Sequence, residues 1–259
     1  MEDREDLNVR KTFGIFYLRY CYIVWILLTN DKRRNKMKAT RSEALESYYL
    51  NKCREKVDNE RTGIHASDLD GCLLKIYYRR TMKPPPEISK DSCLKFVRGW
   101  AVEQFVAPGT LEPITKEGII CSLDDKLPSL GECEIKSTTK SMKGFDPLNT
   151  YYWWTTRMKT YCFAYGTKKI NLVVFFLNGN YKDIRTDLRC WTLRFTDDEL
   201  VENWVEMQRR AKILRIALET HEPISFGEVH PLKFGKGTEC DYCDLNDTCQ
   251  FYLSEVVGI

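Results

Sequence analysis

The chain has 259 residues, of which 43% are hydrophobic and 12% aromatic, so it is long and apolar enough to bury a sizeable core. This composition excludes an intrinsically disordered protein. The formal net charge of +3 is small for a chain in which 30% of the residues are charged, so any affinity for nucleic acid has to come from local clusters of Lys and Arg.

The first predicted segment, 13–28, is almost wholly apolar and aromatic, apart from Arg19, and a basic run follows at 32–36. It is shorter than the ~20 residues of a membrane-spanning helix and carries a charge near its middle. Three interpretations stay open: a peripheral anchor, an extra element packed on the domain, or a stretch upstream of the true start. Met37 opens a clean helical pattern, which favours the last. We therefore expect a hydrophobic leader at 1–36, a functional domain at 37–259 and no firm membrane partner.

Two helices are predicted next. Ser67 is expected to cap a helix that runs through Cys72, with basic and aromatic residues interleaved after the cysteine. The second helix, 91–106, places Gly99 one turn before Glu103. This spacing predicts that the helix approaches the sheet closely at Gly99 and directs Glu103 towards a pocket, although a single acid on a helix is more often a solvated surface residue.

The central motif is an acid followed ten residues later by an acid-x-Lys triplet: Asp124, then Glu134, Ile135 and Lys136. Because side chains alternate along a strand, Glu134 and Lys136 are predicted to project to one face while Ile135 turns into the core. Asp124 is expected on the preceding strand, with 126–130 forming the turn between the two strands. The adjacent Asp125 is an alternative in the next register.

Two carboxylates that converge in this way suit Mg²⁺ or Mn²⁺, hard cations that prefer oxygen ligands. Such an ion polarises a phosphate and lowers the pKa of water, and Lys136 would neutralise charge that develops in the transition state. A solvated hairpin explains an isolated acid-x-Lys triplet equally well. The rest of the chain has to decide between the two interpretations.

A basic, hydroxyl-rich loop at 137–144 suits contacts with phosphate, or is an ordinary surface turn. A helix is then predicted to end at Gly166, with an aromatic stripe that belongs mostly to the core. Arg157 and Tyr161 are one turn apart on this helix and are expected to reach the scissile phosphate together.

The remaining elements complete an α/β pattern. A continuous apolar strand at 169–177 is predicted to be central and buried on both faces, and a return strand is expected around Trp191 to Phe195. Thr196 and Glu199 form a capping box that opens a long helix, with Arg210 expected away from its buried side. The predicted fold is therefore α/β, with a short mixed sheet flanked by helices.

Three cysteines, Cys240, Cys243 and Cys249, lie within ten residues of a polar segment, which is typical of metal ligands rather than of core residues. His221 or His230 would complete a zinc site, and Cys72 would complete a four-cysteine iron-sulfur site. Five other cysteines lie singly in apolar surroundings and are expected in the core: Cys53, Cys121, Cys133, Cys162 and Cys190. With no signal peptide evident, this usage favours a reducing, cytoplasmic compartment over a disulfide framework.

Taken in order, these motifs resemble the PD-(D/E)XK nucleases of the RecB branch, most of all the iron-sulfur nuclease family associated with CRISPR (the Cas-four type). The resemblance covers residues from about 60 to 250. It implies a restriction-endonuclease-like core with a C-terminal cysteine segment, a [4Fe-4S] cluster, and Mg²⁺ or Mn²⁺ in the active site. The cluster ligands would be Cys72, Cys240, Cys243 and Cys249. The metal ligands would be Asp124, Glu134 and the carbonyl of Ile135, with Lys136 as the catalytic lysine.

Two positions depart from the family pattern. Glu103 replaces the usual His, which leaves its role as a metal ligand and the metal preference open, and Arg157 replaces a Gln beside the matching Tyr161. The expected activity is that of a metal-dependent DNA exonuclease on single strands or free ends, in CRISPR adaptation with integrase proteins or in recombination and repair. The alternative is a nucleic-acid-binding module without catalysis and with a four-cysteine zinc site.

Overall fold

The structure, a computed structural model, describes residues 41–55, 61–83, 87–107, 111–177, 186–224, 243–245 and 249. The chain divides into two compact units, 1–48 and 49–259, and helix α2 (Glu43–Arg54) begins in the first and ends in the second. The predicted leader 1–36 lies outside the described residues. Within the described ranges, no helix combines the length and the apolar character needed to cross a membrane.

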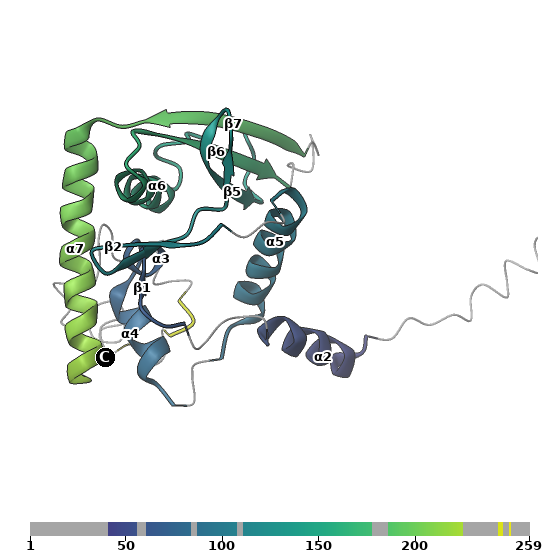
Figure 1. The fold of residues 1–259 in the computed structure, drawn as a ribbon. Helices are drawn as coiled ribbons and strands as arrows, with labels where there is room; N and C mark the ends of the chain where they lie inside the picture. Colours follow the sequence, from purple (N-terminus) through teal and green to yellow (C-terminus); the bar gives the residue numbers. More distant parts are fainter. Residues whose placement is uncertain are drawn as a thin grey trace, which may run out of the picture. The chain divides into compact units, whose positions relative to one another are not determined.

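The larger sheet of the second unit has four strands in the order β4-β5-β6-β7 (Figure 1). Strand β4 (Asp125–Leu127) and strand β7 (Asp187–Arg194) lie at its edges, and β5 (Gly131–Thr138) and β6 (Lys169–Phe176) lie at its centre. The β5-β6 pair is parallel, whereas the two outer pairs are antiparallel. The prediction of a mixed sheet flanked by helices is confirmed.

A second sheet contains three short strands in the order β1-β3-β2. Strand β1 (Ile64–His65) runs parallel to β3 (Ile119–Cys121), and β2 (Ile114–Lys116) is antiparallel to β3. The β3 strand leads directly into the link that contains Asp124 and then into β4. This small sheet therefore fixes the start of the predicted acidic motif.

Strand β6 is central, as predicted, but it is not equally buried on its two faces. Alternate residues, from Ile170 to Phe176, are fully buried, and those between them are only partly covered. The antiparallel partner β7 pairs Leu193 with Ile170 and confirms the predicted return strand. The apolar run therefore presents one strongly buried face.

Two helices, α6 (Tyr152–Tyr165) and α7 (Asp197–Thr220), pack against each other and contribute residues to the hydrophobic core. Gly166 ends α6 in the left-handed conformation at φ 69°, which glycine adopts without a steric penalty. The backbone N–H of Thr196 donates to Glu199 and that of Glu199 donates to the Thr196 hydroxyl, so the predicted capping box is confirmed. Both helix boundaries thus follow from local chemistry.

The helix predicted from Ser67 to Arg80 is divided into α3 (Ala66–Leu69) and α4 (Leu73–Thr81). Ser67 is not a cap, because its hydroxyl accepts from Arg61, while the Asp68 carboxylate accepts from the His65 N–H that precedes α3. The break at 70–72 exposes backbone carbonyls that a distant arginine binds, as described below.

Helix α5 (Lys90–Val106) begins after Ser89, whose hydroxyl accepts from the backbone N–H of Ser92, and the predicted helix 91–106 is confirmed. It packs beside β5 (Figure 1). Close approach at Gly99 is not observed, because a Cβ atom built there would meet no atom within 4 Å. Gly99 therefore borders open space and does not allow a close contact between α5 and the sheet.

Three of the five cysteines expected in the core, Cys121, Cys133 and Cys162, are buried. Cys53 is only partly buried and Cys190 is exposed, because it lies on the edge strand β7, where its side chain has no covering layer.

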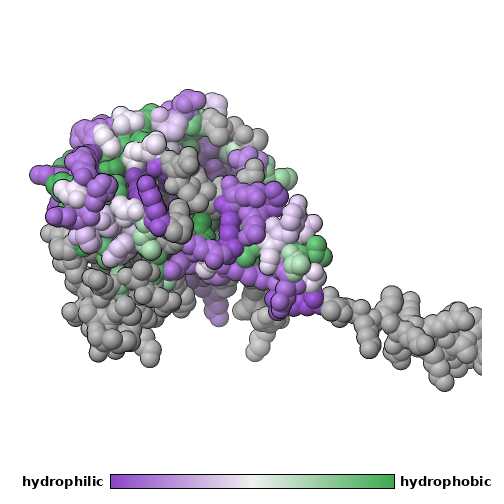
Figure 2. Space-filling model, turned by 90° about the horizontal axis from the view of Figure 1, so that it is seen from below, coloured by the Kyte–Doolittle hydropathy of each residue, from purple (hydrophilic) through white to green (hydrophobic). Residues whose placement is uncertain are grey.

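One face of the molecule shows hydrophobic residues exposed among hydrophilic ones (Figure 2). Exposed apolar residues are therefore not limited to one element.

Candidate active site

Asp124, Glu134 and Lys136 come together beside the middle of strand β5. The link between β3 and β4 positions Asp124, and the alternation of β5 places Glu134 and Lys136 on the same side of the strand. The Lys136 ammonium donates to Glu134 Oε1 at 2.5 Å and lies 3.5 Å from Asp124 Oδ2. The turn between the strands is 128–130, shorter than predicted, since Lys126 and Leu127 pair with β5.

The backbone of β5 joins the same group. The N–H of Ile135 donates to Asp124 Oδ2 at 2.7 Å, which fixes the carboxylate against the strand. The carbonyl of Ile135 accepts from Lys136 Nζ at 3.1 Å. The side chain of Ile135 is only half buried, so the prediction that it fills the core is wrong. The more buried side chain is Glu134, because its face of β5 is the covered one.

Glu134 is a strongly desolvated carboxylate, with only 1% of its surface exposed. Burial and the charge of Asp124 raise the pKa of Glu134 and the cations Lys136 and Arg157 lower it, with a net rise to about 7. Its Oε2 atom is buried without a hydrogen-bond partner. Either a proton or an additional positive charge beside Oε2 would offset the cost of burying this carboxylate.

Lys136 is charged in this environment. Burial by itself lowers the pKa of its ammonium, but the carboxylates of Glu134 and Asp124 outweigh burial and raise the pKa overall. The single ammonium is shared among two carboxylates and one carbonyl. The three N–H groups of the ammonium thus match its three partners.

Glu103 of α5 faces the same charges. Burial raises the pKa of its carboxyl group, as does the negative charge of Asp124, whereas Lys136 lowers it. Among the residues that the structure describes, no three His, Cys, Asp or Glu side chains form a group that could hold a metal ion. Asp124 and Glu134 are thus a pair of carboxylates, and a ligand role for Glu103 stays a prediction.

Arg157 of α6 is held by a residue that sequence reasoning missed, the buried Asp70. Asp70 Oδ2 accepts from Arg157 Nε at 2.6 Å and from Nη2 at 2.5 Å. Burial by itself lowers the pKa of Arg157, but Asp70, Tyr161 and Glu134 raise it overall. The guanidinium is therefore a permanent cation beside Glu134, oriented by the α3–α4 break.

Arg210 is the second residue that was missed, since it was expected away from the buried side of α7 but has no exposed surface. Its Nε donates to the carbonyl of Leu69 at 2.6 Å, and its Nη2 donates to that of Gly71. These carbonyls lie at the α3–α4 break and have no helical partner there. Arg210 thus stabilises the turn that presents Asp70 to Arg157.

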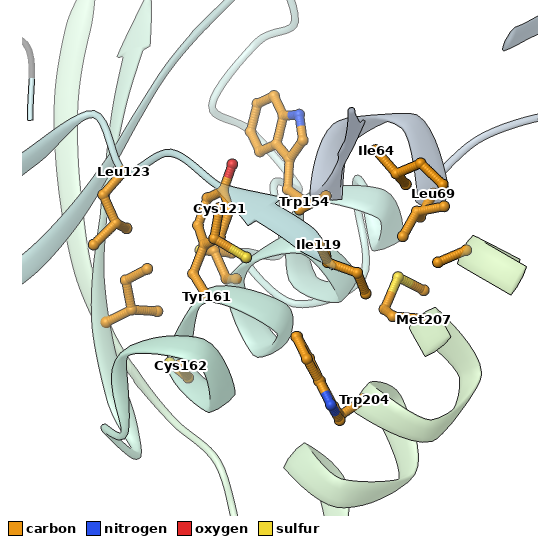
Figure 3. Packing of buried hydrophobic residues seen from close by; sticks show 14 of the residues in the cluster. Ile64, Leu69, Ile119, Cys121, Leu123, Trp154, Tyr161, Cys162, Trp204 and Met207 are labelled. Carbon is orange, nitrogen blue, oxygen red and sulfur yellow. The ribbon is translucent and has the colours of Figure 1, made fainter. Parts of the chain in front are cut away.

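Tyr161 lies in the hydrophobic core together with Cys121 and Trp154 (Figure 3). Burial raises the pKa of its hydroxyl well above the ordinary value, and the charge of Glu134 raises it further. The proton therefore stays on the hydroxyl at physiological pH. Its proposed contact with substrate stays a prediction, and its observed role is packing next to the site.

The described residues 243–245 lie near α4, whose N-cap is Cys72. The Asp244 carboxylate, next to Cys243, accepts from Arg79 of α4 at 3.0 Å and from Ser92 of α5 at 3.2 Å. Cys72 and Cys249 both pack against the main core. Cys240 lies outside the described residues, as does His230, so the four-cysteine group stays a prediction.

No protein-family model and no curated protein matches the chain. Among solved structures, the protein SSO0001 is similar over 79% of this chain and 96% of its own, with 15% identity and a TM-score of 0.48. An alkaline exonuclease from Laribacter hongkongensis covers 62% of this chain and 91% of its own, at 16% identity and a TM-score of 0.44. A phage-related exonuclease from Haemophilus somnus covers 62% and 96%, at 12% identity and a TM-score of 0.42. Likenesses at this level assign no activity to this chain.

Proposed function

We propose that the chain is a divalent-cation-dependent DNA nuclease of the PD-(D/E)XK type that acts on single strands or free ends. One observation carries the proposal: Glu134 is a buried carboxylate with an unsatisfied oxygen, next to a second carboxylate and a lysine. A solvated hairpin does not explain it, because such a carboxylate would hydrate. A cation bound by oxygen ligands relieves this cost.

The residues that would hold Mg²⁺ or Mn²⁺ are Asp124, Glu134 and the carbonyl of Ile135, with Glu103 as a further carboxylate. When bound, a divalent cation supplies a polarised phosphate and a water of lowered pKa. Lys136 holds an ammonium at this position, where it neutralises charge on the phosphate as the phosphorus–oxygen bond breaks. Arg157, held by Asp70, keeps a second positive charge beside Glu134.

The direct test is an end-labelled single-stranded oligonucleotide incubated with the purified chain and Mn²⁺. We expect progressive shortening from an end, which stops when EDTA is added. An oligonucleotide that binds but is never cut, with Mn²⁺ or Mg²⁺, would instead support the alternative of a binding module without catalysis.

We also propose that Cys72, Cys240, Cys243 and Cys249 hold a [4Fe-4S] cluster that joins the two ends of the domain. The docking of Asp244 on α4 and α5 supports this arrangement, because it keeps Cys243 near the helix that Cys72 opens. A role in CRISPR adaptation with integrase proteins, or in recombination and repair, is part of the same proposal, and the genes beside this one would test it.

Replacing Cys72 with Ser is expected to abolish iron binding, because a cluster of this kind requires four thiolates. Elemental analysis of anaerobically purified protein should give about four iron atoms per chain for the wild type. Cys190→Ser is the matched control, since Cys190 is exposed on β7 and should leave the iron content unchanged. About one zinc per chain without iron would contradict the cluster and favour the zinc site.

A further inference from the structure

Helix α5 is unusual in how little of it is covered. Of its residues, only Cys93 is fully buried. Large apolar side chains are exposed on it instead: Leu94, Phe96, Val97, Trp100, Phe105 and Val106. A helix of 17 residues normally buries a continuous apolar stripe. Contacts within the described chain therefore do not explain the apolar side chains of α5.

Two of these side chains form an ordered pair. The rings of Phe96 and Trp100 are stacked, with centroids 6.2 Å apart and an angle of 26° between their planes. Their exposed fractions are 39% and 36%. Because residues four and seven apart share a helix face, this pair lies on the face that carries Glu103. The aromatic pair thus lies on the same face of α5 as Glu103, within two turns of it.

Gly99 lies on the same side of the helix, one turn before Glu103. A glycine inside a helix costs about 1 kcal/mol relative to alanine. No close packing compensates for it, since a Cβ atom there would meet nothing within 4 Å. What Gly99 provides is open space between the aromatic pair and the acidic pocket.

We propose that this face of α5 binds an unpaired strand of nucleic acid, with a base on the Phe96–Trp100 pair and the sugar-phosphate chain passing over Gly99. The inference rests on the proposed nuclease function and specifies its substrate as single-stranded. The adjacent pocket contains the ammonium of Lys136, which contacts Asp124 and Glu134. Helix α5 packs beside β5, which carries that lysine.

An unpaired strand fits these features better than a duplex or a protein partner. Base-on-aromatic stacking needs an accessible flat ring and tolerates any base, whereas the bases of a duplex already stack on one another. A protein partner would cover the exposed apolar residues on both sides of the helix, and the comparison of Trp100 with Phe105 described below tests this alternative. On α5, the ring–ring contact is that of Phe96 and Trp100, next to Gly99 and on the face that carries Glu103.

The test is fluorescence anisotropy of a labelled single strand, measured in EDTA so that binding is separated from cleavage. Trp100→Ala is expected to weaken binding roughly 5- to 150-fold, as for the loss of one stacked base. Phe105→Ala is the matched control, because Phe105 is an aromatic residue of the same helix that is 87% exposed. It lies five residues after Trp100, so helical spacing places it on another side of α5. This replacement should leave the affinity unchanged.

Gly99→Leu provides a second variant, since leucine favours the helix and its side chain would fill the open space. It should weaken binding without lowering the melting temperature. Equal effects of Trp100→Ala and Phe105→Ala, or an equal loss of affinity for a blunt duplex, would overturn the inference. The outcome is independent of catalysis: wild-type cleavage with no effect of Trp100→Ala refutes the binding face alone, and an effect of Trp100→Ala without cleavage refutes the nuclease alone.

Discussion

Replacing Glu134 with Gln is expected to lower DNA cleavage strongly and, at pH 8 without metal, to raise the melting temperature. The pKa of Glu134 rises from 4.5 to about 7, mainly through burial. This shift corresponds to about 3 kcal/mol of folding free energy lost above pH 7. The amide of Gln needs hydrogen bonds of its own, so we expect a gain of ~1–2 kcal/mol, or ~2–8 °C. Cleavage should fall on the order of 10³-fold.

The sign of the pH dependence follows from the direction of the shift. Between pH 4.5 and about 7, the folded protein holds a proton on Glu134 that the unfolded chain has released. The free energy of unfolding therefore falls as the pH rises through this range, and the loss is complete above pH 7. In Glu134→Gln, this dependence of the free energy of unfolding on pH should disappear. Melting curves of both proteins from pH 5 to 8 measure it directly.

Glu132→Gln is the matched control for charge removal on the same strand. Burial alone would raise the pKa of Glu132, but hydrogen bonds from its own backbone and from Lys126 lower it overall. Its replacement should therefore leave the protein no more stable at pH 8. Mn²⁺ should raise the melting temperature of the wild type and of Glu132→Gln, but not that of Glu134→Gln. Equal stabilisation of all three would refute the proposed metal ligands.

The sequence predicts those parts of the fold that depend on neighbouring residues. The capping box of α7 and the glycine that ends α6 each operate over a few residues, and the structure confirms both. Burial along β5 does not alternate, since Cys133 and Glu134 are both buried and Ile135 is only partly so. The alternation of side-chain direction along a strand still predicts that Glu134 and Lys136 share a face, which their 2.5 Å contact reflects. Asp124 was expected on the strand before β5 but lies one residue before β4, in the link from β3. The short turn between β4 and β5 still brings it to the site.

The rest depends on contacts between distant residues, which leave no local pattern. Asp70 and Arg157 are 87 residues apart in sequence, and Arg210 binds the carbonyl of Leu69 across 141 residues. On a helix that also carries exposed arginines, composition cannot distinguish the buried one. The Asp-Gly pair at 70–71 indicates a break in the helix, but not which arginine uses it. Gly99 was misjudged because a glycine that permits close contact and one that leaves open space look the same in sequence.

Replacing Lys136 with Met is expected to lower cleavage by about 10²–10³-fold, because the phosphate loses a fixed positive charge. It should also destabilise the metal-free protein by about 3–5 kcal/mol, since Glu134 and Asp124 would lose their shared ammonium. Lys136→Arg should not restore activity, because the planar guanidinium cannot occupy the position of a compact ammonium. Single-turnover cleavage and urea unfolding without metal measure the two effects.

The two effects should separate when a divalent cation is added. Lys136 binds the same oxygens that are proposed to hold the ion, so its removal leaves them dependent on metal charge. Mn²⁺ is therefore expected to stabilise Lys136→Met more than the wild type while leaving cleavage low. Lys126→Met is the control, because Lys126 pairs with Glu132 at 3.0 Å on the exposed edge strand. If Lys136→Met cleaved DNA at the rate of Lys126→Met, Lys136 would have no role in the reaction.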